Sequence, residues 1–221
     1  MKTSNPLRTL LILVIICIPS IYTASVYSTL PATIPTHFGI NGKPDAYSDK
    51  DSIWIVLIIM AVVSSGVYLL IRNLPKIDPK KTAGQSPELY NKIATIIVIF
   101  LSALSLIIAY STVNGSVNIN KLMLPLMGLF FAVLGNYMHS IKPNYFVGFR
   151  VPWTLENEDN WRKTHQLVGK IWVPGGLLLS IITLLLPATP GFIVFFAIVT
   201  VMVIVPAVYS YRYYKKQQNN A

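Results

Sequence analysis

The sequence carries very little charge. Only 12% of its 221 residues are Asp, Glu, Lys or Arg, whereas a soluble domain carries about 25%. The chain also has a single cysteine, Cys17, so it cannot form an internal disulfide. We expect Cys17 to be a small buried apolar residue. These shortages exclude an ordinary soluble domain and an internally disulfide-bonded fold.

Motifs for common enzyme chemistry are missing as well. The sequence contains no HExxH, GxGxxG, Walker loop or CxxC pair. No Asp, Glu, Lys or Arg lies near the middle of an apolar run, which counts heavily against a carrier driven by protons or sodium. We therefore predict no enzymatic activity, no catalytic residue, no metal and no cofactor.

What the sequence does have is long apolar runs, with 53% hydrophobic residues overall. A run of about 20 residues spans the roughly 30 Å hydrocarbon layer as an α-helix. Barrel strands alternate every second residue and these runs do not, so a barrel is excluded. We predict an all-α integral membrane protein with six transmembrane helices, at Leu7–Ser28, Ser52–Ile71, Ile93–Tyr110, Leu122–Met138, Gln166–Leu186 and Gly191–Tyr209.

The distribution of basic residues predicts the orientation of these helices. With six spans, 15 of the 18 basic residues fall on the side that holds both termini. Positive residues favour the cytoplasmic side, so we predict that both termini are cytoplasmic. The cytoplasmic set is Lys2, Arg8, Arg72, Lys76, Lys80, Lys81, Lys92, Lys142, Arg150, Arg162, Lys163, Lys170, Arg212, Lys215 and Lys216; the external set is Lys43, Lys50 and Lys121.

We expect one compact membrane domain with two halves. Residues 1–111 form a three-helix half with an external loop, Leu30–Asp51, that is rich in Pro, His and Asp. Residues 112–221 form the second half, which carries the polar cytoplasmic segment Asn136–Gly169. Pro19 lies inside the first span, where a kink is expected and neighbours must satisfy the carbonyl that proline leaves without a partner.

The end of the cytoplasmic segment reads as an amphipathic helix. Asn157 suits a helix cap, with acidic residues in the first turn that follows. Trp161, His165, Val168 and Trp172 then fall on one face of the helix and basic residues on another. We predict an interfacial amphipathic helix before the fifth span.

The candidate binding residues lie in these two polar segments. A loop that simply folds against the helix ends is the alternative for the cytoplasmic set, and a solvated connector is the alternative for the external set. His37 is predicted to be outside and the other two histidines inside, which excludes a three-histidine metal site. The cytoplasmic set is Asn136, His139, Asn144, Arg150, Trp153, Thr154, Trp161 and His165; the external set is Pro35, His37, Phe38, Asp45 and Tyr47.

These segments carry a family resemblance that covers most of the chain. The pattern Gly135-Asn136, Pro143-Asn144, Gly148-Phe149-Arg150, Pro152-Trp153-Thr154-Leu155, Trp161, Thr164-His165 and Gly169 resembles the signature of SdpI-like bacterial membrane proteins. The external pattern Leu30-Pro31, Pro35, His37-Phe38, Gly42, Pro44-Asp45 and Tyr47 resembles a domain of unknown function that often precedes this signature, and Pro75–Pro79 fits the same pattern.

The resemblance implies a function that the residues alone do not. It implies a multi-pass protein of the bacterial plasma membrane that confers immunity to a secreted membrane-active peptide, the sporulation-delaying toxin. For some relatives it also implies signalling, with a cytoplasmic transcriptional repressor held at the membrane. The partners expected are therefore the lipid bilayer, a peptide toxin outside and a repressor inside, with no direct contact to nucleic acid.

Two alternatives belong to other functional classes. An integral-membrane enzyme or lipid-handling protein would use Arg150, His139 and His165 on phosphate headgroups at the inner leaflet, and it requires these side chains to converge. A passive carrier needs a polar path through the helices, and the spans supply little beyond Ser, Thr and Tyr.

Overall fold

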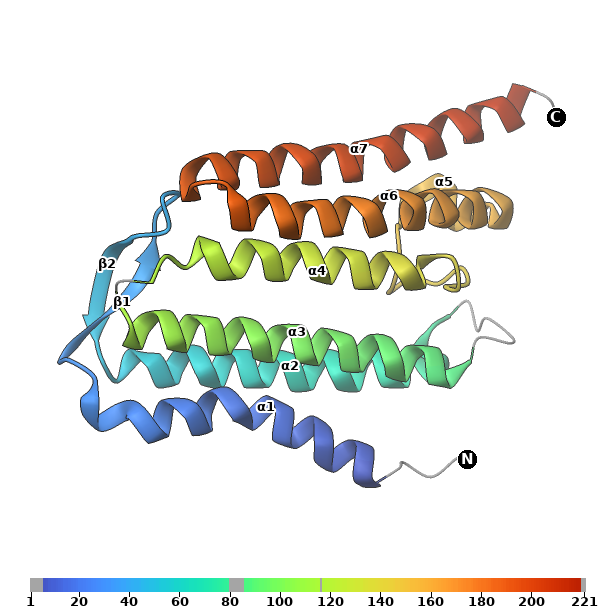
Figure 1. Ribbon diagram of the computed structural model, residues 1–221. Coiled ribbons are helices and arrows are strands. Elements are labelled where there is room, and N and C mark those ends of the chain that lie inside the picture. The colour runs from blue at the N-terminus through green and yellow to red at the C-terminus, as the bar shows by residue number, and fades with distance from the viewer. Residues whose placement is uncertain (1–5, 80–85, 116, 220–221) are drawn as a thin grey trace. The chain divides into compact units, whose positions relative to one another are not determined.

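The computed structural model describes residues 6–79, 86–115 and 117–219 (Figure 1). Lys2, Lys80 and Lys81, which contribute to the predicted orientation, lie outside the described residues. The elements in chain order are α1 (Pro6–Val26), the 3-10 turn η1 (Tyr27–Thr29), β1 (Thr33–Phe38), β2 (Pro44–Asp49), α2 (Ser52–Ile77), α3 (Pro87–Val113), α4 (Asn120–Met138), α5 (Pro152–Glu156), α6 (Glu158–Leu185) and α7 (Ala188–Asn219).

Six of the helices are long and apolar enough to cross a membrane: α1 with η1, α2, α3, α4, α6 and α7. Many of their large apolar side chains face away from the protein interior. Val62, for example, is 65% exposed and Leu185 is 78% exposed. Apolar surface on this scale is unfavourable in water and suits contact with lipid. The prediction of six helices long and apolar enough to span a membrane is confirmed for the described residues. The helices α2, α3, α6 and α7 are longer than predicted, at 26, 27, 28 and 32 residues.

The prediction that Cys17 is buried was wrong, because its side chain is exposed. Cys17 lies on α1, whose buried residues are Ile12, Pro19 and Thr23. An apolar side chain on a spanning helix is as compatible with lipid as with the protein interior. Composition alone therefore cannot tell which face of such a helix is buried.

The chain forms two compact units. The first comprises Met1–Arg72 and Asn91–Met123, and the second comprises Asn73–Tyr90 and Leu124–Ala221. Each has an apolar core of its own. The core of the first unit contains Leu30, Ile34, Ile53, Leu57 and Ala109; that of the second contains Leu124, Leu179, Phe195 and Met202.

In the first unit, a serine compensates for the proline inside α1. Pro19 has no N–H, so the carbonyl of Ile15, four residues earlier, loses its helical partner. The hydroxyl of Ser102 on α3 donates to this oxygen at 2.5 Å. A carbonyl without a partner inside a membrane costs several kcal/mol, about as much as any unpaired polar group there. The expectation that a neighbour satisfies the carbonyl freed by Pro19 is confirmed.

The segment between α1 and α2 is a β-hairpin, which the all-α prediction missed. β1 and β2 pair antiparallel, with Thr33 opposite Asp49 and Pro35 opposite Tyr47. The register shifts on either side of His37. A two-stranded sheet tolerates proline at the start of a strand or at an edge position without a ladder hydrogen bond. The segment predicted as an external loop is therefore an ordered β element rather than an extended connector.

In the second unit, α4 and α6 approach each other at glycines. A Cβ on Gly176 would lie 2.4 Å from the carbonyl oxygen of Gly128, and one on Gly135 would lie 2.7 Å from Cβ of Trp172. Each contact is possible only without a side chain, which is the usual role of small residues between membrane helices. The polar residues that flank these glycines on the two helices are thereby brought together.

The predicted interfacial helix is not a separate element. Its residues form the first turns of α6, which continues without interruption through Pro174 to Leu185. The face predicted from Trp161, His165 and Val168 is buried inside the protein, since each of these side chains is at most 1% exposed. Amphipathic spacing alone cannot distinguish a face that packs on protein from one that packs on lipid headgroups. The position of these turns at the membrane surface stays a prediction.

Candidate functional site

The polar segment Asn136–Gly169 carries the signature pattern and is called the signature segment below. Its loop between α4 and α6 is folded around the buried side chain of Asn144. Its amide group donates to the carbonyl oxygens of Lys142 and Val147, both at 2.9 Å. Its carbonyl oxygen accepts the backbone N–H groups of Phe146, at 2.8 Å, and Val147, at 2.6 Å. Asn144 is fully buried, and both its donor hydrogens and its acceptor oxygen are occupied. This residue organises the loop rather than presenting itself to a ligand.

His165 holds the next part of the loop through both of its ring nitrogens. Nε2 accepts the backbone N–H of Phe149 at 2.9 Å. Nδ1 lies 2.9 Å from the carbonyl oxygen of Trp161 and therefore carries the hydrogen. The imidazole also stacks on the Trp161 indole, with ring centroids 4.0 Å apart. His165 is thus a buried neutral imidazole whose two nitrogens are engaged within the protein.

Gly148 makes this contact possible. Its φ of +114° is a conformation that residues with a side chain rarely adopt. A Cβ at this position would lie 2.4 Å from Nε2 of His165 and 3.2 Å from the Trp161 ring. The signature glycine is therefore required both by the backbone conformation and by the ring that packs against it.

The other buried signature residues join the loop to α6 and α7. Thr154 accepts the N–H of Val151 at 3.1 Å and caps the short helix α5. The Trp161 indole donates to the carbonyl oxygen of Ile141 at 2.7 Å. The Trp153 indole donates to the hydroxyl of Ser210 on α7 at 2.7 Å. These bonds connect the start of the signature segment, at Ile141, to α6, and connect α5 to α7.

The start of α6 is capped and charged as the sequence predicts. The Asn157 side chain accepts the N–H of Asn160 at 2.8 Å, so the predicted cap is confirmed. Asp159 accepts hydrogen bonds from Arg162 at 2.6 Å and from the hydroxyl of Tyr213, and lies 3.0 Å from Nζ of Lys163. The basic face of this helix is partly neutralised within the protein.

Asn160 and Ser210 were not predicted as site residues, although they connect α6 to α7. The Asn160 amide donates to the carbonyl oxygen of Ser210 at 3.0 Å, and its own oxygen accepts the hydroxyl of Thr164 at 3.0 Å. Both residues are fully buried. Ser210 lies between two tyrosines on an apolar helix, and nothing in the sequence indicates that it hydrogen-bonds α6.

Two exposed residues of the predicted cytoplasmic set line a surface groove, unlike the buried residues described above. Asn136 and His139 at the end of α4 line a groove of about 540 Å³ with Gln166 and Lys170 of α6. Gly135, Gly169 and Val173 complete its lining. Gln166 and Lys170 were not predicted as site residues, because on the helical wheel they fall with Arg162 and Lys163 on the polar side of the predicted interfacial helix.

Arg150 is exposed and donates through Nη1 to the carbonyl oxygen of Tyr145 at 2.5 Å. The alternative of an integral-membrane enzyme or lipid-handling protein requires Arg150, His139 and His165 to act together on one headgroup. His165 uses both nitrogens inside the protein, Arg150 bonds its own loop, and His139 lines the groove beside α6. This alternative is therefore not favoured. Among residues 6–79, 86–115 and 117–219, no group of three or more His, Cys, Asp or Glu is placed to hold a metal ion.

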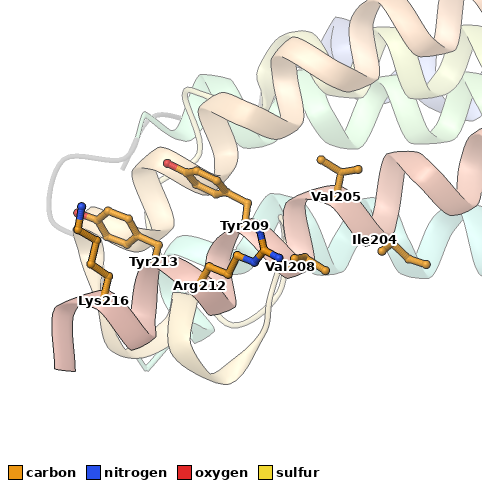
Figure 2. A pocket seen from close by; sticks show the side chains of 7 residues that line it. All are labelled: Ile204, Val205, Val208, Tyr209, Arg212, Tyr213 and Lys216. Carbon is orange, nitrogen blue, oxygen red and sulfur yellow. The ribbon is translucent and has the colours of Figure 1, made fainter. Parts of the chain in front are cut away.

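A second groove, of about 490 Å³, follows the surface of α7 alone. Its lining changes along the helix from apolar Ile204, Val205 and Val208 to the cations Arg212 and Lys216 (Figure 2). Tyr209 and Tyr213 lie between them with nearly parallel rings, 19° apart. Apolar residues followed by tyrosines and cations are typical of a helix that leaves the hydrocarbon layer.

The hairpin presents the other candidate site. Among the predicted external residues, His37, Asp45 and Tyr47 are exposed, Phe38 is half-buried and Pro35 is buried. Nδ1 of His37 lies 2.5 Å from Oδ1 of Asp45 on the facing strand, and these side chains are 70% and 51% exposed. Three of the five predicted residues are therefore exposed, and Pro35 is buried.

The hairpin is held firmly at both ends. Ile34 is 1% exposed and packs with Leu30, Ile53 and Leu57. At the turn, Asn118 donates to the carbonyl oxygen of Asn41 at 2.7 Å, and Asn120 donates to that of Ile40 at 2.9 Å. These two asparagines were missed by sequence reasoning, because they lie more than 70 residues from the turn that they hold.

The structure therefore defines a helical membrane protein with a polar signature segment and a pinned hairpin. Residues 140–210 match the model of the SdpI/YfhL protein family, and residues 14–61 match that of DUF1648, a domain of unknown function. The chain thus carries a region similar to the SdpI/YfhL family and, ahead of it, a region similar to DUF1648, which confirms the resemblance drawn from the sequence.

Two relatives show how far the similarity extends. The chain is 26% identical over 212 residues to "Immunity protein SdpI" of Bacillus subtilis, and this match covers 95% of the chain and 97% of the relative. It is 32% identical over 62 residues to an uncharacterized protein of Archaeoglobus fulgidus, which covers 28% of the chain and 33% of that protein. No solved structure matches the chain.

Proposed function

We propose that this protein confers immunity to a secreted, membrane-active peptide toxin and that the β1–β2 hairpin is the surface that engages the toxin. Support for the class comes from the match to an immunity protein over 95% of the chain. Support for the surface comes from the hairpin itself. It is pinned at its base and its turn, yet it exposes His37, Asp45 and Tyr47.

The rigidity of the hairpin is the observation that carries the proposal. A flexible connector would lose conformational entropy on binding, whereas a surface already held in place loses little. Ile34 anchors one end of the hairpin in the apolar core, and Asn118 and Asn120 hold the turn. The exposed surface then combines an aromatic ring with a His–Asp pair, a composition suited to contact with an amphipathic peptide.

The proposal places the hairpin outside the plasma membrane and both termini in the cytoplasm. The supporting observation is the charge bias, with only 3 of 18 basic residues on the hairpin side. Three spans, α2, α3 and α4, separate the hairpin from the signature segment. The two polar segments would therefore face opposite sides of the membrane, and a secreted toxin would meet the hairpin first.

The buried signature residues support this function by keeping the second unit folded. Asn144, Thr154, Trp161 and His165 direct their polar atoms into the protein. We do not assign these four residues to toxin binding. Retention of a cytoplasmic repressor at the membrane stays a prediction from the family resemblance alone.

The test is survival of a strain sensitive to the sporulation-delaying toxin. We expect the full-length protein to protect the strain, and we expect the double variant Asp45→Asn, Tyr47→Ala to lose most of the protection. The matched control is Thr36→Ala, an exposed position on the same hairpin. Membrane-inserted protein is quantified for each strain. Unchanged killing despite full insertion of the unaltered protein would exclude the immunity function, and full protection by the double variant would exclude the hairpin.

A further inference from the structure

The groove between α4 and α6 is lined by polar side chains that the protein itself does not use. The groove is lined by Asn136, His139, Gln166 and Lys170. Among the described residues, none of these four side chains makes a hydrogen bond or an ion pair. The buried signature residues nearby have their side-chain donors and acceptors engaged. We propose that this groove binds the phosphate group of an anionic phospholipid.

The glycines explain why the four side chains converge. Gly135 lies beside Asn136 on α4, and Gly169 lies beside Lys170 on α6. A Cβ on Gly169 would lie 3.0 Å from the carbonyl oxygen of Gly135, so the two backbones are close at this level. Gln166 and Lys170 are four residues apart in α6 and therefore lie along one side of that helix. On the facing side of the groove, Asn136 lies in the last turn of α4, and His139 directly follows the helix. The glycines line the groove between the two pairs.

The chemistry of the lining selects an anion. Lys170 supplies a positive charge, the two amides supply N–H donors, and the His139 ring can donate from one nitrogen. No acidic residue is among the described residues that line the groove. A phosphate diester has one negative charge and several acceptor oxygens, which this set of donors can satisfy together. A metal cation would find no carboxylate here.

The position of the groove favours a phospholipid as the source of that phosphate. Both helices are apolar spans, and the lining extends from His139 at the end of α4 to Val173 within α6. A headgroup at the polar end would leave its acyl chains beside apolar helix surface. An anionic headgroup is preferred to phosphatidylcholine, because the choline would bring a second positive charge next to Lys170.

The test uses the three histidines as internal reporters. Full-length protein labelled with ¹³C and ¹⁵N at histidine is purified in a zwitterionic detergent and titrated with phosphatidylglycerol. The His139 signal, assigned with a His139→Gln variant, is expected to shift and saturate. The signals of His165, which is buried, and His37, which is on the hairpin, are expected to stay in place. Phosphatidylcholine is expected to leave all three unchanged.

Two variants that each remove one positive charge then test whether the groove is the binding site. Lys170→Gln removes the cation of the groove and should weaken phosphatidylglycerol binding roughly tenfold, as expected for loss of one charge-assisted hydrogen bond. Lys215→Gln removes an exposed cation that lies over the Tyr211 ring on α7, outside the groove, and should leave binding unchanged. An unmoved His165 signal in each variant shows that the signature segment is still folded.

Three results would overturn the proposal: an unchanged His139 signal, equal weakening by both lysine variants, or a shift with a poly-glutamate peptide but not with phosphatidylglycerol. A shift with inorganic phosphate and not with the lipid would keep the phosphate chemistry and reject the lipid as its source. The titration contains no toxin, so its failure is distinguishable from failure of the immunity function.

Discussion

The indole N–H of Trp172 on α6 donates to the carbonyl oxygen of Met202 on α7 at 3.0 Å. Met202 lies four residues before Pro206, so proline has removed the helical partner of this carbonyl. Ser102 plays the same role for Ile15 and Pro19 in the first unit. In both units, a side chain from a neighbouring helix completes a hydrogen bond that a proline leaves open, which makes the packing of the two helices specific.

Replacement of Trp172 by Phe tests this relationship. Phe keeps the edge contact with Phe131 but removes the N–H donor, so the Met202 carbonyl loses its partner. We expect the free energy of unfolding in mixed micelles to fall by about 1 to 3 kcal/mol. In a Pro206→Ala background, the amide of residue 206 can bond Met202, so the same change should cost clearly less. An equal cost in both backgrounds would contradict the assignment.

Gly148→Ala is expected to unfold the signature segment. The residue has a φ of +114°, and the added Cβ would lie 2.4 Å from Nε2 of His165. Backbone strain alone costs about 1 to 3 kcal/mol, and displacement of the imidazole would also break its bond to Phe149. The measurement is thermal unfolding in detergent, followed by tryptophan fluorescence.

The matched control for Gly148→Ala is Gly66→Ala. Gly66 lies in α2, and nothing is within 4 Å of the position that its Cβ would take. Alanine is the better helix former, so this variant should be as stable as the unaltered protein or slightly more so. Similar midpoints for the two variants would show that the space next to His165 is not the constraint described here.

Asn118→Ala and Asn120→Ala are expected to loosen the hairpin turn without unfolding the helices. Each change removes a donor to a turn carbonyl, of Asn41 or Ile40. A net loss of about 1 kcal/mol in local stability corresponds to an approximately fivefold rise in opening. Hydrogen exchange at the amide of Gly39, which donates to Lys43 across the turn, measures this change.

Asn114→Ala is the control for these two variants, since the Asn114 side chain donates to the carbonyl oxygen of Tyr110 at the end of α3, at 3.0 Å, rather than to the hairpin turn. Exchange at Gly39 should match that of the unaltered protein. If all three variants exchange alike, the turn is not held by Asn118 and Asn120.

The helices could be predicted from the sequence because a membrane span needs only length and a lack of charge. The hairpin could not, since Pro35 and Pro44 argue against strands in a single sequence. The contacts that hold its turn come from Asn118 and Asn120, which are distant in the sequence. Among the residues predicted to be cytoplasmic, the sequence also did not show that Asn144 and His165 are buried whereas Asn136 and His139 are exposed. Polar side chains of the same types can be buried and hydrogen-bonded within the protein, or exposed without a partner. Only tertiary contacts decide between these two roles.

The most direct measurement of the central claim is labelling of a cysteine placed on the hairpin. In a Cys17→Ser background, Lys43→Cys on the hairpin turn is expected to react with a membrane-impermeant maleimide in intact cells, whereas Arg150→Cys is expected to react only after permeabilisation. Added toxin should slow the reaction at position 43. Labelling of position 150 from outside, or a rate at position 43 that the toxin leaves unchanged, would contradict the account of an outward hairpin that engages the toxin.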